Sequence, residues 1–517
     1  MQEPNTQSQG FTIVELLVVI VVIGILAAIT IVSYTGINRQ ATIASLQSDL
    51  SSASRQLKMF KVDNGVYPAT ISADCVTEPT TTTNQCLKAS PGSSYVDYQV
   101  DDASNPQSFT LTEMKSGLYY MVTDDGLPTY VSSSPYWKRV AAGSHHSCAI
   151  TSEGQAYCWG WGGNGRLGNN SSTNSSVPVA VSSAGVLNGK TLKSISIGGS
   201  HACAIASDNQ AYCWGNNING QLGNNTTTGG SVPVAVSIVG VLSGKTVKSI
   251  SVGSDHTCAI ASDNLAYCWG TGGNGQLGNA STANTSVPVA VSTGGVLSGL
   301  TVKSIVAGGG YTCAIASDNQ AYCWGLGNQG QLGNNTSSNT SVPVTVSSSG
   351  ALSGKTIKSV APGWSHTCAI ASDNQAYCWG NGTNGQLGNG ASSTSLVPVA
   401  VSTSGAFSGK TIKSIAAGDY YYTCALASDN QVYCWGIPTY GVLGNNLGAS
   451  SPVPVAVSTS GVLSGKTVQS ITTGFGHVCA LSSDNQIYCW GAGTLGQLGN
   501  SSFADSPIPV TVIPLGS

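Results

Sequence analysis

Charged side chains are scarce in this chain. Only 8% of its 517 residues are Asp, Glu, Lys or Arg, and the formal net charge is -3. A surface that binds phosphates, or that steers ligands over long distances, needs many charges of one sign. The composition therefore argues against a phosphate-binding surface, and we expect no nucleic acid among the partners.

The sequence also lacks a catalytic group that occurs once. Its acids recur in turns and its serines are generic. No histidine, acid and nucleophile stand outside the repeating pattern, as the side chains of an active site would. We therefore predict no catalytic residues and no cofactor, and we expect that the protein is not an enzyme.

Glycine and cysteine are abundant instead. The chain has 65 glycines and 16 cysteines, and its regularly spaced Val, Ile and Leu can form a core. Its length exceeds that of one ordinary domain, so we expect at least two folded units. All but two of the cysteines form equally spaced pairs, which favours an oxidising compartment.

A long apolar run near the N-terminus contains one acid. Residues 11–34 are long enough to cross a bilayer as a helix that rises about 1.5 Å per residue. Glu15 lies inside this run, where an unpaired carboxylate is energetically costly. A partner should therefore compensate it.

Residues 10–15 read GFTIVE, and with the apolar run they resemble the processing site of type IV pilins and pseudopilins. The resemblance implies that a prepilin peptidase cuts between Gly10 and Phe11 and that the new N-terminus is methylated. It also implies that Glu15 pairs with the amine of a neighbouring subunit during assembly. The alternative is a plain signal anchor with a stray acid. The leader, residues 1–10, has no Lys or Arg, and Val32 stands where many major pilins have proline, so the filament type stays open.

The first helix is predicted over residues 11–62, and its second half is amphipathic. Gly65 and Pro68 end it. Three β-like runs follow near residues 95–100, 108–115 and 118–123, and they predict a small pilin-like β domain over residues 63–136. The resemblance to pilins suggests a disulfide between Cys75 and Cys86. The apolar face of the helix consists of Ile43, Leu46, Leu50, Ala53, Leu57 and Phe60.

From residue 137 onward one unit is repeated seven times. The first cysteine of each pair recurs every 55 residues, with a single spacing of 56. Such a period indicates a repeat architecture. Each unit has four short β-prone runs between clusters of Gly, Asn, Asp and Ser, so the repeats predict a propeller of seven four-stranded blades over residues 137–517.

The units resemble the regulator of chromosome condensation repeat family. Nearly every copy contains His-x-Cys-Ala-Ile, Tyr-Cys-Trp-Gly and Asn-Gly-Gln-Leu-Gly. The resemblance implies a closed ring that serves as a binding scaffold with changeable loops. It does not imply nucleotide exchange on a small GTPase, because an exported protein does not meet that partner. The predicted fold class is mainly β: a seven-bladed β-propeller preceded by a long N-terminal α-helix and a small α+β pilin-like domain.

The two cysteines of each unit have nine residues between them. A three-residue Ser-Asp-Asn turn would place them opposite each other on adjacent strands, at disulfide distance. A two-residue turn would shift the register and leave buried thiols. Because the chain has an export signal, we favour disulfides. The predicted pairs are Cys148–Cys158, Cys203–Cys213, Cys258–Cys268, Cys313–Cys323, Cys368–Cys378, Cys424–Cys434 and Cys479–Cys489.

The Trp of each Cys-Trp-Gly is expected to pack between blades. A histidine stands two residues before the first cysteine in five units, and Tyr311 and Tyr422 replace it in the other two. Histidines on separate blades cannot converge on one ion, so we predict hydrogen bonds at strand ends and no metal site. The histidines are His146, His201, His256, His366 and His477.

The two faces of the predicted ring differ. Loops between the first and second strands and between the third and fourth strands share one face, whose aromatics interrupt the repeat. Aromatic side chains dominate interface hot spots, so this is the predicted binding face; the alternative is that they fill gaps between loops. The opposite face carries Ser-Asp-Asn turns and lysines, whose charges are expected to balance locally. The predicted binding residues are Trp161, Tyr311, Trp364, Tyr420, Tyr421, Tyr440 and Phe475.

These patterns predict a minor or tip subunit of a type IV pilus. It would be inserted in the cytoplasmic membrane before assembly and then displayed at the cell surface. Its N-terminal helix would contact other pilin subunits, and its propeller would bind an extracellular protein or glycan. The alternative is a pseudopilin of a type II-like secretion machine with a substrate-binding propeller.

Overall fold

A computed structural model describes residues 40–72, 80–101, 108–115, 118–124, 126–131, 136–419 and 421–514. The chain divides into two compact units, residues 1–134 and 135–517. The predicted cleavage site and the predicted membrane span, residues 11–34, lie outside the described residues. Within the described ranges, no helix is both long and apolar enough to cross a membrane.

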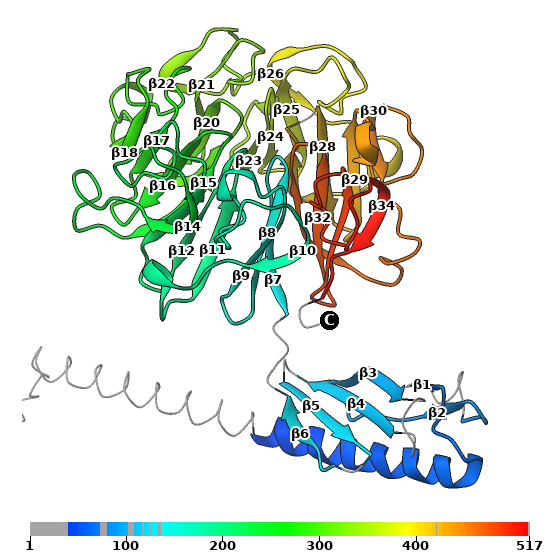
Figure 1. Ribbon diagram of the computed structural model, residues 1–517. Coiled ribbons are helices and arrows are strands. Elements are labelled where there is room, and N and C mark those ends of the chain that lie inside the picture. The colour runs from blue at the N-terminus through cyan, green and yellow to red at the C-terminus, as the bar shows by residue number, and fades with distance from the viewer. Residues whose placement is uncertain are drawn as a thin grey trace, which may run out of the picture. The chain divides into compact units, whose positions relative to one another are not determined.

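In the first unit a helix packs on a small antiparallel sheet (Figure 1). Residues 40–64 are helical, so the helix ends close to the position that Gly65 predicts. Leu46, Leu50 and Leu57 are fully buried against Phe109 and other residues of the sheet. The sheet has the order β3(Ser93–Asp101), β4(Ser108–Lys115), β5(Leu118–Thr123), β6(Thr129–Val131), and β1(Thr70–Ser72) pairs in parallel with β2(Asn84–Cys86).

One cysteine of this unit is described. Cys86, at the end of β2, is disulfide-bonded. Cys75 lies outside the described residues, so its pairing with Cys86 stays a prediction.

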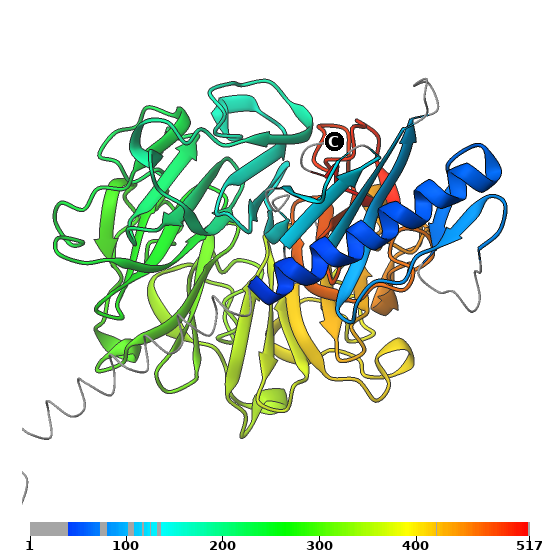
Figure 2. The ribbon, with the colours of Figure 1, turned by 90° about the horizontal axis from the view of Figure 1, so that it is seen from below.

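The second unit is the predicted propeller: seven four-stranded antiparallel sheets around one axis (Figure 2). Each blade uses four consecutive strands, from the inner edge outward. The blades are β7(Trp137–Ala142), β8(His146–Thr151), β9(Ala156–Gly160), β10(Ser175–Ala180); β11(Leu192–Ile197), β12(His201–Ala206), β13(Ala211–Gly215), β14(Gly230–Ala235); β15(Val247–Val252), β16(His256–Ala261), β17(Ala266–Gly270), β18(Thr285–Ala290); β19(Val302–Ala307), β20(Tyr311–Ala316), β21(Ala321–Gly325), β22(Thr340–Thr345); β23(Ile357–Pro362), β24(His366–Ala371), β25(Ala376–Gly380), β26(Ser395–Ala400); β27(Ile412–Ala417), β28(Tyr422–Ala427), β29(Val432–Gly436), β30(Ser451–Ala456); and β31(Val468–Thr473), β32(His477–Ser482), β33(Ile487–Gly491), β34(Ser506–Thr511). Short 3-10 turns lie in the connections: η1(Gly163–Gly165), η2(Gly185–Leu187), η3(Gly295–Leu297), η4(Gly350–Leu352), η5(Gly405–Phe407) and η6(Thr439–Gly441).

A disulfide joins the second and third strands of every blade. In blade two, Cys203 pairs directly with Cys213 across the ladder. The Asn209 N–H donates to the Ala206 carbonyl and closes a three-residue turn, in which Asn209 has φ 60°. Asn tolerates this left-handed conformation. The three-residue turn and all seven propeller disulfides are therefore confirmed, with Cα atoms 4.0–4.1 Å apart.

The repeated tryptophans hold neighbouring blades together, as predicted. Trp269 is fully buried, and its indole Nε1–H donates to the Gln221 carbonyl of the preceding blade at 3.0 Å. A Cβ added to Gly223 would come within 2.6 Å of that nitrogen, which explains the glycine in Gln-Leu-Gly. The same bond closes the ring between blades seven and one, where Trp159 donates to Gln497.

The repeated histidines form a second belt between blades. His201 Nε2 lies 2.7 Å from Thr257 Oγ1, and that hydroxyl donates its only hydrogen to the Gln221 carbonyl at 2.9 Å. His201 Nε2–H must therefore be the donor in this hydrogen bond. Burial lowers the pKa of His201 to about 3. Equivalent bonds at His256, His366 and His477 confirm the predicted hydrogen-bonding role.

His146 breaks this belt. Its two ring nitrogens are buried and have no hydrogen-bond partner among the described residues. The cause is local, because blade two has Ala202 at the position that Thr257 occupies in blade three. Burial, together with the charge of Arg166, lowers the pKa of His146 well below its ordinary value.

Ala202→Thr should repair this gap. The new hydroxyl would accept from His146 and donate to the Arg166 carbonyl, as Thr257 does with the Gln221 carbonyl. We expect a gain of about 1 kcal/mol in the free energy of unfolding, measured by denaturant titration. Thr257→Ala makes the opposite change in blade three and should lower the free energy of unfolding by a similar amount. A loss of stability in Ala202→Thr would contradict the explanation.

Candidate binding face

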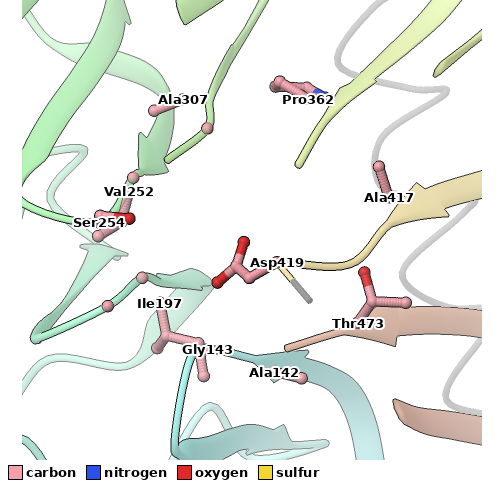
Figure 3. Close-up of a pocket in the computed structure, with 14 residues that line it drawn as sticks. Ala142, Gly143, Ile197, Val252, Ser254, Ala307, Pro362, Ala417, Asp419 and Thr473 are labelled. Atoms are coloured by element: carbon pink, nitrogen blue, oxygen red, sulfur yellow. The ribbon is translucent and has the colours of Figure 1, made fainter. Parts of the chain in front are cut away.

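The connections between strands divide between two faces of the propeller. The loop face is the face formed by the connections between first and second strands and between third and fourth strands. The turn face is the opposite face, formed by the hairpins between second and third strands and by the links between blades. At the centre of the loop face lies a cavity of about 90 Å³. The ends of all seven inner strands line it (Figure 3): Ala142, Ile197, Val252, Ala307, Pro362, Ala417 and Thr473.

Among the described residues that line this cavity, Asp419 is the only acid, and Figure 3 shows its carboxyl group directed inward. Its Oδ2 accepts from the Ser144 hydroxyl at 3.2 Å, and its N–H donates to the Gly474 carbonyl. Burial raises the pKa of Asp419 to about 6. Sequence reasoning missed this residue, although it lies in the one repeat of 56 residues, where an extra residue lengthens the loop before Tyr422.

An aromatic cluster spans blades seven and one on the loop face. The His145 ring lies 5.8 Å from Trp161 and 5.2 Å from Phe475, between ring centroids. Arg166 lies 3.7 Å from the Trp161 ring centroid and is 1% exposed. The structure thus brings together two of the predicted binding residues, at positions 161 and 475, from opposite ends of the propeller sequence.

Arg166 is the cation beneath this cluster. It stands where most blades have Gln, and its Nε and Nη1 groups donate to the Gly163 and Gly199 carbonyls at 2.8 Å each. Burial lowers its pKa to about 10, so the guanidinium remains charged at neutral pH. A charged guanidinium against an indole face is a cation–π contact that fixes the ring. Trp161 is therefore presented in one orientation.

Tyr440 extends the cluster into blade six. It is 42% exposed and lies over Gly476, where an added Cβ would come within 2.9 Å of the ring. Tyr440 and Tyr421 have φ values of 61° and 55°. Such values are outliers for a bulky residue, and strained backbone of this kind concentrates at functional sites. The fold thus holds two predicted binding tyrosines at an energetic cost.

Trp364 lies elsewhere on the loop face. It belongs to blade five, is 45% exposed and packs against Gly309 of blade four. Its indole is therefore available at the surface.

The structure contradicts the binding prediction for Tyr311. This side chain is fully buried, and its hydroxyl donates to the His366 carbonyl at 2.7 Å. It takes the place of a histidine in the belt between blades, so it cannot contact a partner. Tyr420 lies outside the described residues.

Three exposed apolar residues of the same loops were missed. Ile218, Leu447 and Phe503 are 70%, 73% and 53% exposed, and each lies between the third and fourth strands of its blade. The signal was present in the sequence, because Ile218 replaces the Gly, Asn or Thr of other repeats. The varied surface of the loop face is therefore larger than the aromatic pattern predicted.

A closed ring of seven four-stranded, disulfide-braced blades defines a β-propeller. Comparison with known proteins agrees. The family model for the RCC1-like domain matches residues 114–405, and models for the regulator of chromosome condensation (RCC1) repeat match segments from residue 412 to 517. The chain belongs to the RCC1-like family. The prokaryotic N-terminal methylation motif matches residues 5–31, so the N-terminus is of the type IV pilin kind.

Relatives are found in sequence and in structure. The ultraviolet-B receptor UVR8 of Arabidopsis thaliana is 31% identical over 373 residues, which are 72% of this chain and 80% of the receptor. Among solved structures, yeast RCC1 (Prp20) bound to Kap60 has a TM-score of 0.60 at 20% identity and covers 74% of this chain and 86% of that one. Human WBSCR16 has a TM-score of 0.59 at 20% identity and covers 69% of this chain and 89% of that one. Both structures share the propeller fold.

Proposed function

We propose that this protein is a minor or tip subunit of a type IV pilus, and that the loop face of its propeller binds an extracellular protein or glycan. The observation that carries the proposal is the combination of a methylation motif at residues 5–31 with a propeller that has one non-repeating face. The motif supports insertion in the cytoplasmic membrane, processing by a prepilin peptidase and assembly with other pilins through the N-terminal helix. On this proposal the protein acts by binding and catalyses no reaction.

The geometry of the loop face supports adhesion. A partner without sevenfold symmetry needs distinct contacts, and specificity is a difference between affinities at such contacts. Trp161 held by Arg166, the strained Tyr440 and the exposed Trp364 each occur once. Seven disulfides suit an oxidising location outside the cytoplasm.

Location tests the proposal most directly. Antibody to the propeller, applied to intact cells, should decorate extracellular filaments or their tips. Gly10→Leu should abolish this label, because a bulky residue at the predicted cut blocks maturation and keeps the precursor in the membrane. Glu15→Val is the matched control: it should be cut but should assemble poorly, because its neutral helix can no longer pair with a neighbouring amine.

Two results would reject parts of this proposal. A purely periplasmic signal from the unaltered protein would reject adhesion and favour the pseudopilin of a secretion machine. Mature protein that starts at Phe11 in the Gly10→Leu variant would reject processing of the pilin kind.

A further inference from the structure

Most of the few charged residues of the propeller lie on one of its two faces. Residues 137–517 contain 13 Lys and Arg and 10 Asp and Glu. Every one of these cations except Arg166 lies on the turn face, beside seven of the acids. The overall composition, which argued against an anion-binding surface, conceals this concentration. The turn-face cations are Lys138, Arg139, Lys190, Lys193, Lys245, Lys248, Lys303, Lys355, Lys358, Lys410, Lys413 and Lys466.

The lysines that lie in the links between blades are neutralised. We call these five the outer lysines: Lys190, Lys245, Lys355, Lys410 and Lys466. Each forms an ion pair with the Asp of the next hairpin, at N–O distances of 2.8–3.9 Å. For them the predicted local balance of charge is confirmed.

The lysines that begin the inner strands are not neutralised. We call these the inner lysines: Lys193, Lys248, Lys303, Lys358 and Lys413. Each donates to the side-chain oxygen of a turn asparagine, as Lys193 does to Asn209 at 2.6 Å. None of them forms an ion pair within the described part of the propeller. The prediction of local balance is wrong here, and the inner lysines leave a ring of uncompensated positive charge around the axis.

A hollow between the first three blades lies in this ring. It has a volume of about 480 Å³ and is lined by Arg139, Lys193 and Lys248. The polar side chains of Ser194, Asn209 and Thr246 share its wall. A volume of roughly 300–1,000 Å³ is usual for a small-molecule site. Its size and its mixture of cations with hydroxyl and amide groups match one acidic sugar, whose charge and hydroxyls need such partners.

We infer that the turn face binds an acidic polysaccharide, with one acidic sugar seated between Arg139, Lys193 and Lys248 and the following residues of the polymer crossing the other inner lysines. The charges lie in a ring rather than along a groove, which suits a flexible polymer that bears a charge on each sugar. Glu153 lies with Lys138 and Lys193 around a neighbouring hollow of about 180 Å³, so the charge is partly offset on the blade-one side.

Single-stranded nucleic acid fits this face less well. Binding of unpaired bases uses exposed aromatic rings on which the bases stack. A tyrosine is the second residue of each third strand at this face, and Tyr157 of blade one is half-buried against Trp137. The other six are only 1–5% exposed: Tyr212, Tyr267, Tyr322, Tyr377, Tyr433 and Tyr488. Their hydroxyls are bound to the aspartates of the hairpins, so the rings are not offered to a ligand.

The test uses the full chain in mild detergent and polygalacturonate as the probe. Binding should be measurable by calorimetry at low salt and should weaken as salt is added. Methyl-esterified polygalacturonate keeps the sugar chain without its charges and should not bind. Lys193→Gln with Lys248→Gln should weaken binding at least about tenfold, the loss expected when charged hydrogen bonds are removed.

The chain supplies its own control in the same blades. Lys190→Gln with Lys245→Gln removes the same formal charge from the outer lysines and should change affinity less than about threefold, because those cations are already paired. Equal losses in the two double variants, at unchanged melting temperature, would overturn the assignment of the site. Absence of binding to polygalacturonate, or tighter binding to duplex DNA or to anionic vesicles, would overturn the acidic polysaccharide. The outcome does not depend on where the protein resides, so it is separate from the test of pilus location.

Discussion

The propeller should lose several kcal/mol of unfolding free energy between pH 7 and pH 5. Burial lowers the pKa of His201, His366 and His477 to about 3 and that of His256 to about 4. In the unfolded chain these groups titrate near 6.5. Below that pH the unfolded state binds more protons, so stability falls as pH falls, by about 1.4 kcal/mol per pH unit for each histidine.

One group opposes this trend. The pKa of Asp419 is raised to about 6 in the folded state, above its ordinary value of 3.8. The folded state therefore gains stability as pH falls from 6 towards 3.8, which offsets about one of the histidines. The other three of these histidines, and His146, whose pKa is also lowered by burial, leave a clear net loss of stability in acid.

Tryptophan fluorescence can measure the effect on the full chain. All 10 tryptophans lie at or after residue 137, so their signal reports on the propeller alone. Denaturant titrations at several pH values should show the loss. His256→Tyr is a matched variant, because Tyr311 already fills the equivalent place and bonds across the same gap. This variant should lose less unfolding free energy as the pH falls, because its unfolded state takes up one proton fewer. Stability that does not change between pH 7 and pH 5 would contradict neutral buried histidines.

The second large effect concerns the loop face. Replacing Trp364 with Ala, and Tyr421 and Tyr440 with Asn, should each weaken attachment of displaying cells about thirtyfold or more, because hot-spot truncations cost about 2 kcal/mol or more. Asn removes the ring but tolerates the left-handed backbone; Asn164 has φ 60° at the position in blade one that corresponds to Tyr440.

Two controls separate contact from folding. Each variant must keep the melting temperature of the unaltered protein, since loss of a packing aromatic would mimic loss of a contact. Lys355→Ala and Lys410→Ala should hardly affect attachment, because both are outer lysines on the other face. If the stable aromatic variants attach normally while the lysine variants do not, the adhesive site lies on the turn face.

The fold was predictable because each blade repeats the same local rules. The spacing of Cys203 and Cys213 and the Ser-Asp-Asn turn together set the hairpin register. Tyr311 could also have been placed correctly, since it aligns with histidines for which a buried role was already predicted. Its aromatic character instead predicts a binding role, and that prediction is wrong because the side chain is fully buried.

Other features depend on distances that the sequence does not contain. Lys190 and Lys193 are three residues apart, yet one reaches Asp208 and the other reaches Asn209. Only the geometry of the hairpin decides which charge stays uncompensated. The raised pKa of Asp419 likewise arises from burial at the axis, where seven distant segments meet.

The position of the disulfides has a mechanical consequence for a propeller under tension. Each propeller disulfide closes a segment within one blade, with a sequence separation of 10 residues. A chain pulled from its ends would therefore lengthen in steps shorter than a whole repeat, because each covalent loop withholds about 36 Å of contour length at 3.6 Å per residue. Every extended blade would keep the two ends of its central hairpin joined. When the tension is released, each of the seven blades would therefore refold from a segment whose two ends its disulfide still joins.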